Sequence, residues 1–427
     1  MGESLLMPAL SRVDGTLSCE EVPLDQIADR VGTPAYIYSS ASIRTQYTAL
    51  VEALNGIDVH IHYSVKANSS LSILSLLREL GAGVDIVSGG ELYRVRKAGF
   101  TGDDIVFSGV GKTADELEAA LLAGVKTINV ESLGELDLLH QIAKRLGVVA
   151  PVMLRVNPDV SVNSPHPYIR TGEHGMKFGI PDDQVVAIAR TILHLPHVAL
   201  KGLAAHLGSQ ITQPEPYATT LRRLCALCEE IRAIGITTLS YLDLGGGLPV
   251  AYRDDTPADL TEFANAIRSV AQHAGLQLFL EPGRYIVAAA GVLLTRVLYR
   301  KHSGGKEIVI TDAGMNDLIR PALYEAYHTI EPVHDTTAPL TANIVGPVCE
   351  SGDFFALDRE IGAVQPGDLL AIRTSGAYSF VMSSNYNSRP RCAEVLVDGT
   401  KFAVVTRRET YDDLIGRETL TLDWSEA

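Results

Sequence analysis

The sequence is poor in three features, and each shortage excludes a class of protein. Its five cysteines are an odd number spread over 427 residues, which does not resemble a disulfide framework. The net charge is −15 and no cluster of Lys and Arg stands out, so a nucleic-acid partner is not expected. The longest apolar run, Tyr285 to Leu294, has only ten residues and is too short to span a bilayer.

A targeting signal is also missing from the amino terminus. Met1 to Leu6 has no basic region followed by an apolar core, and Leu6 stands where a myristoylation pattern requires Ser or Thr. With 46% apolar and 20% charged residues, the composition is that of an ordinary globular chain, long enough for two domains. We therefore expect a cytoplasmic, soluble protein with no membrane partner.

One cysteine pair needs a separate interpretation. Cys225 and Cys228 form a C-x-x-C, but no second pair accompanies them and the surrounding apolar residues recur at helical spacing. We expect two core cysteines on a helix face, in preference to a metal or redox site.

Runs rich in Val, Ile and Leu alternate with amphipathic segments through the first two thirds of the chain. The strand-like runs are residues 58–67, 83–88, 104–109, 126–132, 151–157, 200–208, 241–247 and 276–283. The helical segments are residues 41–54, 71–80, 91–98, 114–123, 133–146, 183–193, 217–234 and 260–274. This strict alternation predicts an eight-stranded parallel (β/α)8 barrel over residues 31–285, although an open doubly wound sheet fits the periodicity too. A long connection without regular period, 158–177, is expected to be functional.

The pattern changes after Arg284. Short apolar runs lie between Gly, Pro, Asn and Asp turns, which is typical of an antiparallel β-domain. These runs are residues 291–299, 306–311, 340–345, 369–373, 391–397 and 401–406. We expect residues 286–427 to form this domain and residues 1–30 to complete it with a strand or hairpin.

Residues with unusual chemistry stand at the ends of the predicted barrel strands, where barrels form their active sites. Lys66 ends the first strand and His206 the sixth. The seventh ends in the glycines 245–247 and the eighth in "EPGR". Each feature has an ordinary explanation: a strand-end lysine can extend to water, a lone histidine can be structural, and glycines can form a tight turn. Their coincidence on one face favours a site.

The glycines predict the ligand. Backbone amides of a glycine-rich loop can approach phosphate, and the following Gly283 and Arg284 add an amide and a cation. A phosphate site beside a lysine amine suggests pyridoxal phosphate. Glu281 is then placed to pair with the pyridine nitrogen, unless it forms a salt bridge to a neighbouring Arg, and His206 to lie on the ring.

Motifs along nearly the whole chain resemble the meso-diaminopimelate decarboxylase family of pyridoxal-phosphate enzymes, which have the alanine-racemase-like fold. They are "YSVKAN", "VDIVSGGEL", "HPYIRTGEHGMKFGI", "HLGSQ", "DLGGGL", "EPGR", "IRPALYEAYH", "GPVCESGDFF" and "GAYSFVMSSNYNSRPR". The resemblance implies a barrel, a carboxy-terminal β-domain completed by the amino terminus, and a homodimer with active sites at the interface. It also implies loss of CO2 from the D-configured carbon of meso-2,6-diaminopimelate to give L-lysine, the last step of lysine biosynthesis.

The resemblance also implies roles for single residues. Cofactor binding falls to Lys66, His206, Ser209, Gly246, Gly247, Glu281, Gly283, Arg284 and Tyr378. Substrate binding falls to Arg284, Arg320, Tyr324, Glu350 and Tyr378. Catalysis falls to Lys66, His206 and the proton donor Cys349, the latter supplied with Glu350 by the partner subunit. If the segment around Pro321 is helical, Arg320 and Tyr324 lie on one face of it.

Other functions remain compatible with parts of the pattern. Sibling decarboxylases act on ornithine, arginine or carboxynorspermidine, but Arg320 with Glu350 favours a substrate whose far end is zwitterionic. A racemase would need a second base opposite Lys66, and Cys349 fits a proton donor better. A non-catalytic pyridoxal-phosphate-binding homologue should have lost Lys66 or Cys349. A lysine aldolase would leave "EPGR" unexplained.

Overall fold

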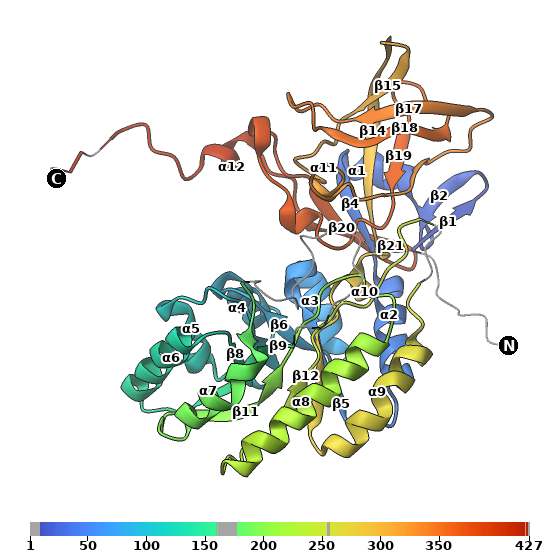
Figure 1. The fold of residues 1–427 in the computed structure, drawn as a ribbon. Coiled ribbons are helices and arrows are strands. Elements are labelled where there is room, and N and C mark those ends of the chain that lie inside the picture. Colours follow the sequence, from blue (N-terminus) through green and yellow to red (C-terminus); the bar gives the residue numbers. More distant parts are fainter. Residues whose placement is uncertain (1–8, 159, 161–176, 254–256, 423, 426–427) are drawn as a thin grey trace. The chain divides into compact units, whose positions relative to one another are not determined.

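The chain divides into two compact units in the computed structural model, which describes all residues except 1–8, 159, 161–176, 254–256, 423 and 426–427 (Figure 1). The first unit contains Ser42–Ala288, and the second consists of Pro8–Ala41 with Ala289–Ala427. Each unit has its own sheets.

The first unit is a closed parallel barrel. Its strands, in chain order, are β5 (Val59–Ser64), β6 (Gly83–Ile86), β7 (Ile105–Phe107), β8 (Thr127–Val130), β9 (Ala150–Asn157), β11 (Val198–Ala204), β12 (Tyr241–Asp243) and β13 (Gln277–Leu280). All pairs are parallel, and the pairings of β13 with β5 and of β8 with β9 close the ring. The barrel prediction is confirmed and the open sheet is excluded. A short strand, β10 (Ile180–Pro181), adds to β9.

Helices follow the strands as the periodicity predicted, and Figure 1 shows several of them along the outside of the barrel. They are α2 (Ser40–Ala53), α3 (Leu71–Glu79), α4 (Gly89–Lys97), α5 (Ala114–Ala123), α6 (Leu133–Leu146), α7 (Val185–Ile192), α8 (Glu215–Ala233) and α9 (Leu260–Ala274). Their ends have local causes. Thr113 accepts a hydrogen bond from the Glu116 amide at the start of α5, and Gly147 ends α6 in the left-handed conformation.

The second unit is a mostly antiparallel β-domain. Its strands are β1 (Leu10–Val13), β2 (Thr16–Cys19), β3 (Val22–Pro23), β4 (Ala35–Ser39), β14 (Gly291–Ser303), β15 (Lys306–Thr311), β16 (Ile330–Pro332), β17 (Pro339–Val345), β18 (Phe354–Gly362), β19 (Leu369–Ile372), β20 (Ala393–Asp398) and β21 (Lys401–Thr406). Strands β1 to β3 form a small separate sheet. Two pairs of the larger sheet, β15 with β17 and β4 with β20, are parallel, so the domain is not purely antiparallel.

The division between the units differs from the expected boundary at residue 31. Strand β4 pairs with β14 and β20, so residues up to Ala41 belong to the β-domain. Every residue of β4 is buried, with Tyr36 and Tyr38 among the largest fully buried side chains. The amino-terminal contribution to this domain is therefore a central strand as well as the small sheet. The unit also contains the helices α1 (Leu24–Val31), α11 (Arg320–Tyr324) and α12 (Tyr411–Ile415).

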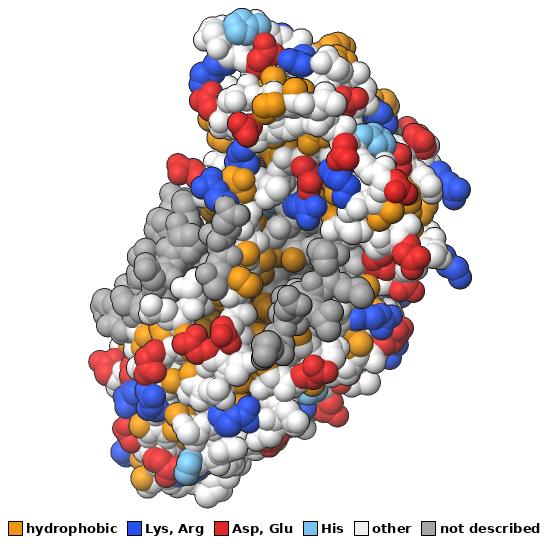
Figure 2. Space-filling model, turned by 90° about the vertical axis from the view of Figure 1, so that its right-hand side faces the viewer, with side chains coloured by type: hydrophobic (Ala, Val, Ile, Leu, Met, Phe, Trp, Pro, Cys, Tyr) orange, Lys and Arg blue, Asp and Glu red, His pale blue; other side chains and the backbone are white. Residues whose placement is uncertain are grey.

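Charges of both signs are interspersed on one face of the molecule. On the face shown in Figure 2, the described Lys and Arg side chains lie among Asp and Glu side chains. Among the helices that the structure describes, none combines the length and the apolar character that a membrane-spanning helix needs.

Candidate active site

The barrel interior changes from apolar to polar toward the carboxyl ends of its strands. Val106, Met153, Ala204 and Phe279 form a buried cluster, against which Tyr241 packs. Side chains on one face of a strand recur every second residue. Two positions further along the same strands stand, in the same order, Ser108, Arg155, His206, Glu281 and Asp243. The sequence therefore builds a polar layer directly above an apolar one, at the end where barrel enzymes carry their active sites.

Lys66 lies at this polar end. It belongs to a single 3-10 turn, Val65–Ala67, that follows β5, and its flanking residues Val65 and Ala67 are buried. The Lys66 Nζ donates a hydrogen bond to Asp85 Oδ2 at 2.9 Å, while its side chain keeps 35% exposure. Asp85 also accepts a hydrogen bond from Ser64 Oγ at 2.8 Å. The amine is thus aimed by a buried carboxylate and remains accessible.

Glu281 and Asp243 stand side by side at the ends of β13 and β12. Both carboxyl groups are buried, with residue exposures of 7% and 1%. Burial is the main cause that raises their pKa values, that of Asp243 to about 6 and that of Glu281 further above its ordinary range. The Ser108 hydroxyl donates to Glu281 Oε1 at 3.4 Å and itself accepts from Asn129 Nδ2 at 2.9 Å.

His206 follows β11 and is held in one tautomer. Its Nδ1 accepts a hydrogen bond from the backbone N–H of Gly246 at 3.1 Å, which requires a deprotonated Nδ1. Burial lowers the pKa of His206 well below 6.5, and the positive charges of Lys66 and Arg155 lower it further. The ring is therefore neutral, with its proton on Nε2.

The glycines after β12 and β13 permit close packing of loops. A Cβ at Gly246 would lie 2.3 Å from the Glu281 carbonyl oxygen, and one at Gly247 would lie 2.6 Å from the Gly208 carbonyl oxygen. Gly247 also has a φ of 104°, in the region that favours glycine. These loops could not approach each other with any larger residue.

Ser209 and Arg284 lie beside these glycines. Arg284 is buried and donates through Nε to Ser209 Oγ at 3.1 Å and through Nη1 to the Tyr252 hydroxyl at 2.8 Å. A Cβ at the preceding Gly283 would meet the Ala67 Cβ at 2.9 Å, next to Lys66 in the sequence. A guanidinium, a hydroxyl and glycine amides at adjoining strand ends form a donor set suited to a phosphate group.

The remaining expected site residues belong to the second unit. Arg320 and Tyr324 begin and end α11, with Pro321 in its first turn, so the segment is helical as predicted. Arg320 is buried, and its Nη1 lies 3.5 Å from His328 Nε2. Tyr378 has a φ of 53°, an uncommon conformation for a tyrosine.

Cys349 and Glu350 lie in a turn after β17, as the polar residues around them predicted. Cys349 is exposed, and its backbone N–H donates to Asn387 Oδ1 at 2.8 Å. The Tyr386 hydroxyl donates to Glu350 Oε2 at 3.3 Å. The Asp353 carboxylate braces the same turn by accepting the Val348 amide at 2.6 Å. Two motifs that are separate in the sequence, around residues 349 and 386, thus meet in the β-domain.

Several polar residues of the barrel site were not anticipated from the sequence. They are Asp85, Ser108, Asn129, Arg155 and Asp243. One signal was available: Asp85 lies between Val84 and Ile86, and Asp243 between two leucines, inside runs that are otherwise apolar. A carboxylate is rarely buried without a role or a partner. The alternation of the strands then places both on the interior face.

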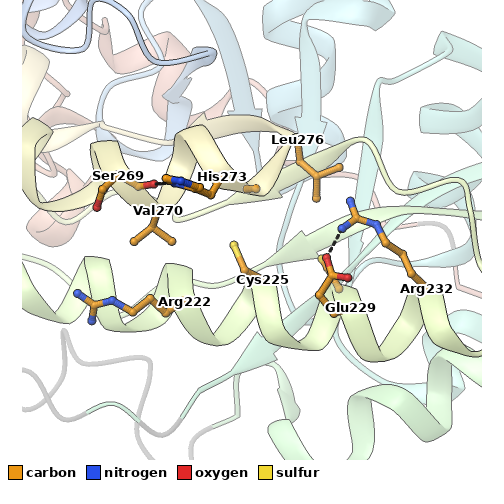
Figure 3. A pocket seen from close by; sticks show the side chains of 10 residues that line it. Arg222, Cys225, Glu229, Arg232, Ser269, Val270, His273 and Leu276 are labelled. Atoms are coloured by element: carbon orange, nitrogen blue, oxygen red, sulfur yellow. Dashed lines mark hydrogen bonds and ion pairs between the residues drawn. The ribbon is translucent and has the colours of Figure 1, made fainter.

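Two other expectations concern features outside this site. The C-x-x-C lies on α8 as predicted, but only Cys228 is a core residue, whereas Cys225 is partly exposed. Cys225 points into a groove of about 420 Å³ between α8 and α9, toward Val270 (Figure 3). In the described part of the chain, no group of three or more His, Cys, Asp or Glu residues is placed to hold a metal ion. The connection 158–177 falls almost entirely outside the described residues.

Comparison with known proteins defines the class of this site. Residues 40–288 match the family model described as "Pyridoxal-dependent decarboxylase, pyridoxal binding domain". This range begins with α2 and ends with the barrel unit. The barrel with its lysine and glycine loops is therefore the pyridoxal-binding domain of a pyridoxal-phosphate-dependent decarboxylase, and the cofactor prediction is confirmed.

Similar full-length proteins indicate which family of pyridoxal-phosphate-dependent decarboxylases this chain belongs to. The chain is 50% identical to a diaminopimelate decarboxylase of Pseudomonas aeruginosa, over 97% of this chain and 99% of the relative. The crystal structure of the Helicobacter pylori diaminopimelate decarboxylase complexed with L-lysine is similar with a TM-score of 0.89 and 38% identity, covering 92% and 99% of the two chains. The m. jannaschii enzyme in co-complex with L-lysine gives a TM-score of 0.91 and 36% identity, covering 96% and 98%. The chain belongs to the diaminopimelate decarboxylase family.

Proposed function

We propose that this protein decarboxylates meso-2,6-diaminopimelate at its D-configured carbon, giving L-lysine and CO2 in the last step of lysine biosynthesis. The observation that carries the proposal is the polar layer of the barrel, where an accessible lysine amine, a buried carboxyl pair and a glycine loop with Arg284 lie at adjoining strand ends. Family membership supplies the substrate. Pyridoxal phosphate, when bound, accepts the electron pair that the departing CO2 leaves behind.

Different barrel residues would bind different parts of the cofactor. Lys66 holds it through its amine, which Asp85 aims from the buried side. Glu281 would pair with the pyridine nitrogen, and the neutral ring of His206 would lie against the cofactor ring. The phosphate is bound by Ser209, Gly246, Gly247, Gly283 and Arg284, and Tyr378 contributes from the β-domain.

The substrate's far end is itself an amino acid, so the site must bind a carboxylate and an ammonium group there. Arg284 and Arg320 bind its carboxylate, since a guanidinium can make a two-pronged hydrogen bond. Glu350 binds its ammonium, with Tyr324 and Tyr378 beside it. The exposed Cys349 Sγ carries the proton that replaces the carboxyl group on the α-carbon.

Two parts of the proposal concern the protein as a whole. We propose a homodimer in which Cys349 and Glu350 complete the site of the partner subunit. We also propose a cytoplasmic location, supported by the five free cysteines, which suit a reducing compartment.

The direct test is an absorbance spectrum followed by an activity assay. The purified protein should show a visible cofactor band that borohydride abolishes, and it should release CO2 and lysine from meso-diaminopimelate. Lys66→Ala should remove the band and lower kcat by roughly 10³-fold or more. Lys144→Ala, a change in an exposed lysine in the last turn of α6, is the control and should alter neither. A coloured protein that ignores diaminopimelate but decarboxylates ornithine, arginine or carboxynorspermidine would reassign the substrate.

A further inference from the structure

The carboxyl groups of Asp243 and Glu281 are held together by the backbone of their two strands. Asp243 on β12 lies opposite Phe279 on β13, and Glu281 follows Phe279 by two residues along the chain. The Gly245 amide donates to Asp243 Oδ1 at 2.7 Å, while the Gly245 carbonyl accepts the Glu281 amide at 2.8 Å. One glycine thus fixes both acidic residues. The Asp243 carboxylate cannot turn away without losing the Gly245 amide, and the backbone of Glu281 is fixed at the same glycine.

The remaining oxygen of Asp243 needs an explanation. Asp243 Oδ2 is fully buried and finds no hydrogen-bond donor among the described residues. The carboxyl group of Glu281 and the amide of Asn129 are the side-chain groups within hydrogen-bonding reach of Asp243. A hydrogen bond between two carboxyl groups exists only if one of them is protonated. Two ionised carboxylates in contact and away from water would repel strongly.

We propose that Asp243 is a positioning residue for Glu281, and that the two carboxyl groups share one proton and carry one negative charge between them. The role for catalysis rests on the proposed function, in which Glu281 faces the pyridine nitrogen. When that nitrogen is protonated, the negative charge resides on Glu281 and the shared proton on Asp243 Oδ2, which donates it in a hydrogen bond to Glu281. Asp243 itself touches neither cofactor nor substrate.

The charges around Asp243 and Glu281 are compatible with one shared proton. Asp85 on β6 and Lys66 after β5 are the charged groups that act on the pair, and they neutralise each other through their 2.9 Å contact. The neutral donors on the pair are the Gly245 amide, the Ser108 hydroxyl and the Asn129 amide. Burial raises the pKa values of both acids, which agrees with one retained proton at neutral pH.

Infrared spectroscopy of the holoenzyme tests the shared proton directly. The wild-type protein at neutral pH should show the carbonyl band of a protonated, buried carboxylic acid that Asp243→Asn lacks. Asp317→Asn is the matched control, because burial raises the pKa of Asp317 to about 7 in the other unit. Its difference spectrum should contain a separate band and leave the Asp243 band in place. Absence of an Asp243-dependent band between pH 6 and 8 would overturn the proposal.

The positioning role is tested on the cofactor itself. With pyridoxal phosphate labelled with ¹⁵N in its ring, the chemical shift of the ring nitrogen should show the protonated form in wild type and in Asp243→Asn, since the asparagine amide still donates to Glu281. Asp243→Leu should shift the ring toward the unprotonated form and lower kcat roughly 10- to 100-fold, the equivalent of one hydrogen bond to a charged group, with little change in KM.

The outcomes separate the two claims. Loss of ring protonation in Asp243→Asn would show that Asp243 acts as an ionised carboxylate and would overturn the shared proton. If the leucine variant does not fold, the asparagine variant and the infrared band still decide. The infrared and ¹⁵N measurements need no substrate, so the pair can be established even if diaminopimelate is not decarboxylated.

Discussion

Single residues of this protein respond to pH in opposite directions because of their surroundings. Glu91 lies in the first turn of α4, where its Oε2 accepts a hydrogen bond from the Val87 amide at 2.7 Å, but burial dominates and raises the pKa of Glu91 to about 7. Glu116 accepts the amides of Gly89 at 2.7 Å and Thr113 at 2.9 Å, and these bonds hold the pKa of Glu116 below its usual range. The two glutamates stand on neighbouring helices and make a matched pair.

Glu91 and Glu116 predict how the free energy of unfolding changes with pH. An acid with a raised pKa contributes stability below its unfolded pKa of about 4.3, and this contribution is lost as pH rises through about 7. Glu91→Gln cannot ionise, so its advantage over wild type in the free energy of unfolding should grow from pH 5 to pH 8, to at most about 3 kcal/mol. Urea unfolding at several pH values, at constant protein concentration, measures this difference.

Glu116→Gln should behave in the opposite way. A lowered pKa contributes stability above the unfolded pKa, which is lost as pH falls. The variant should therefore be less stable than wild type at pH 8, and its deficit should shrink as the solution is acidified. Parallel curves for Glu91→Gln and Glu116→Gln would contradict the assignment of burial to one residue and hydrogen bonding to the other.

At the scale of the elements, the loops after β12 and β13 depend on residues without a Cβ. Gly246→Ala would place a methyl group 2.3 Å from the Glu281 carbonyl oxygen, so the end of β13 must shift. We expect weaker cofactor binding and a loss in kcat on the order of 10²-fold, as for other displacements of catalytic groups. Titration with pyridoxal phosphate, followed by absorbance, and steady-state kinetics measure the two effects.

A glycine in open space is the control for this prediction. Gly134 lies in the first turn of α6 and has no atom within 4 Å of the position of a Cβ. Gly134→Ala should leave cofactor binding unchanged and stabilise the protein by up to about 1 kcal/mol, because alanine loses less backbone freedom on folding. If Gly246→Ala and Gly134→Ala both bound the cofactor like wild type, the close packing of the loop after β12 would not be needed for cofactor binding.

Elements with strong periodicity were predictable from the sequence, and elements defined by tertiary context were not. All eight barrel strands were anticipated, because parallel strands covered on both faces form continuous apolar runs. Strand β18 was missed, since it carries Asp358, Arg359 and Glu360 in its middle. Strand β4 was assigned to the wrong unit, because its partners β14 and β20 lie more than 250 residues further along the chain.

The site residues likewise divide into those that the sequence indicated and those that depend on tertiary context. Lys66 and the glycine loops stand where strands end, so the sequence indicated them. The apolar neighbours of Asp243 indicate a buried carboxylate, but its role was not predictable, because that role depends on Glu281 on the neighbouring strand and on the apolar layer beneath it. The roles of residues in the β-domain came from resemblance alone. Charge and burial in three dimensions are needed to distinguish a carboxylate that ends a strand from one that shares a proton.

At the scale of the whole molecule, the proposed homodimer makes a quantitative prediction. If Cys349 completes the site that contains the partner subunit's Lys66, then Lys66→Ala and Cys349→Ala homodimers are both inactive for different reasons. After equal mixing and subunit exchange, roughly half of the dimers contain one subunit of each kind. In such a dimer one site combines the intact lysine with the intact cysteine, and the other site lacks both. The mixture should recover roughly a quarter of wild-type activity.

Subunit exchange must be shown in the same sample, by native mass spectrometry of one variant carrying an affinity tag. Lys66→Ala mixed with Lys66→Ala of the tagged form is the matched control and should recover nothing, although it exchanges equally well. Activity that stays at the background of the single variants, in a mixture whose exchange is complete, would mean that each site takes its lysine and its cysteine from one chain. Because Cys349 is exposed in the single chain and its turn is braced by Asn387 and Asp353, the thiol is already in place to serve a neighbouring subunit.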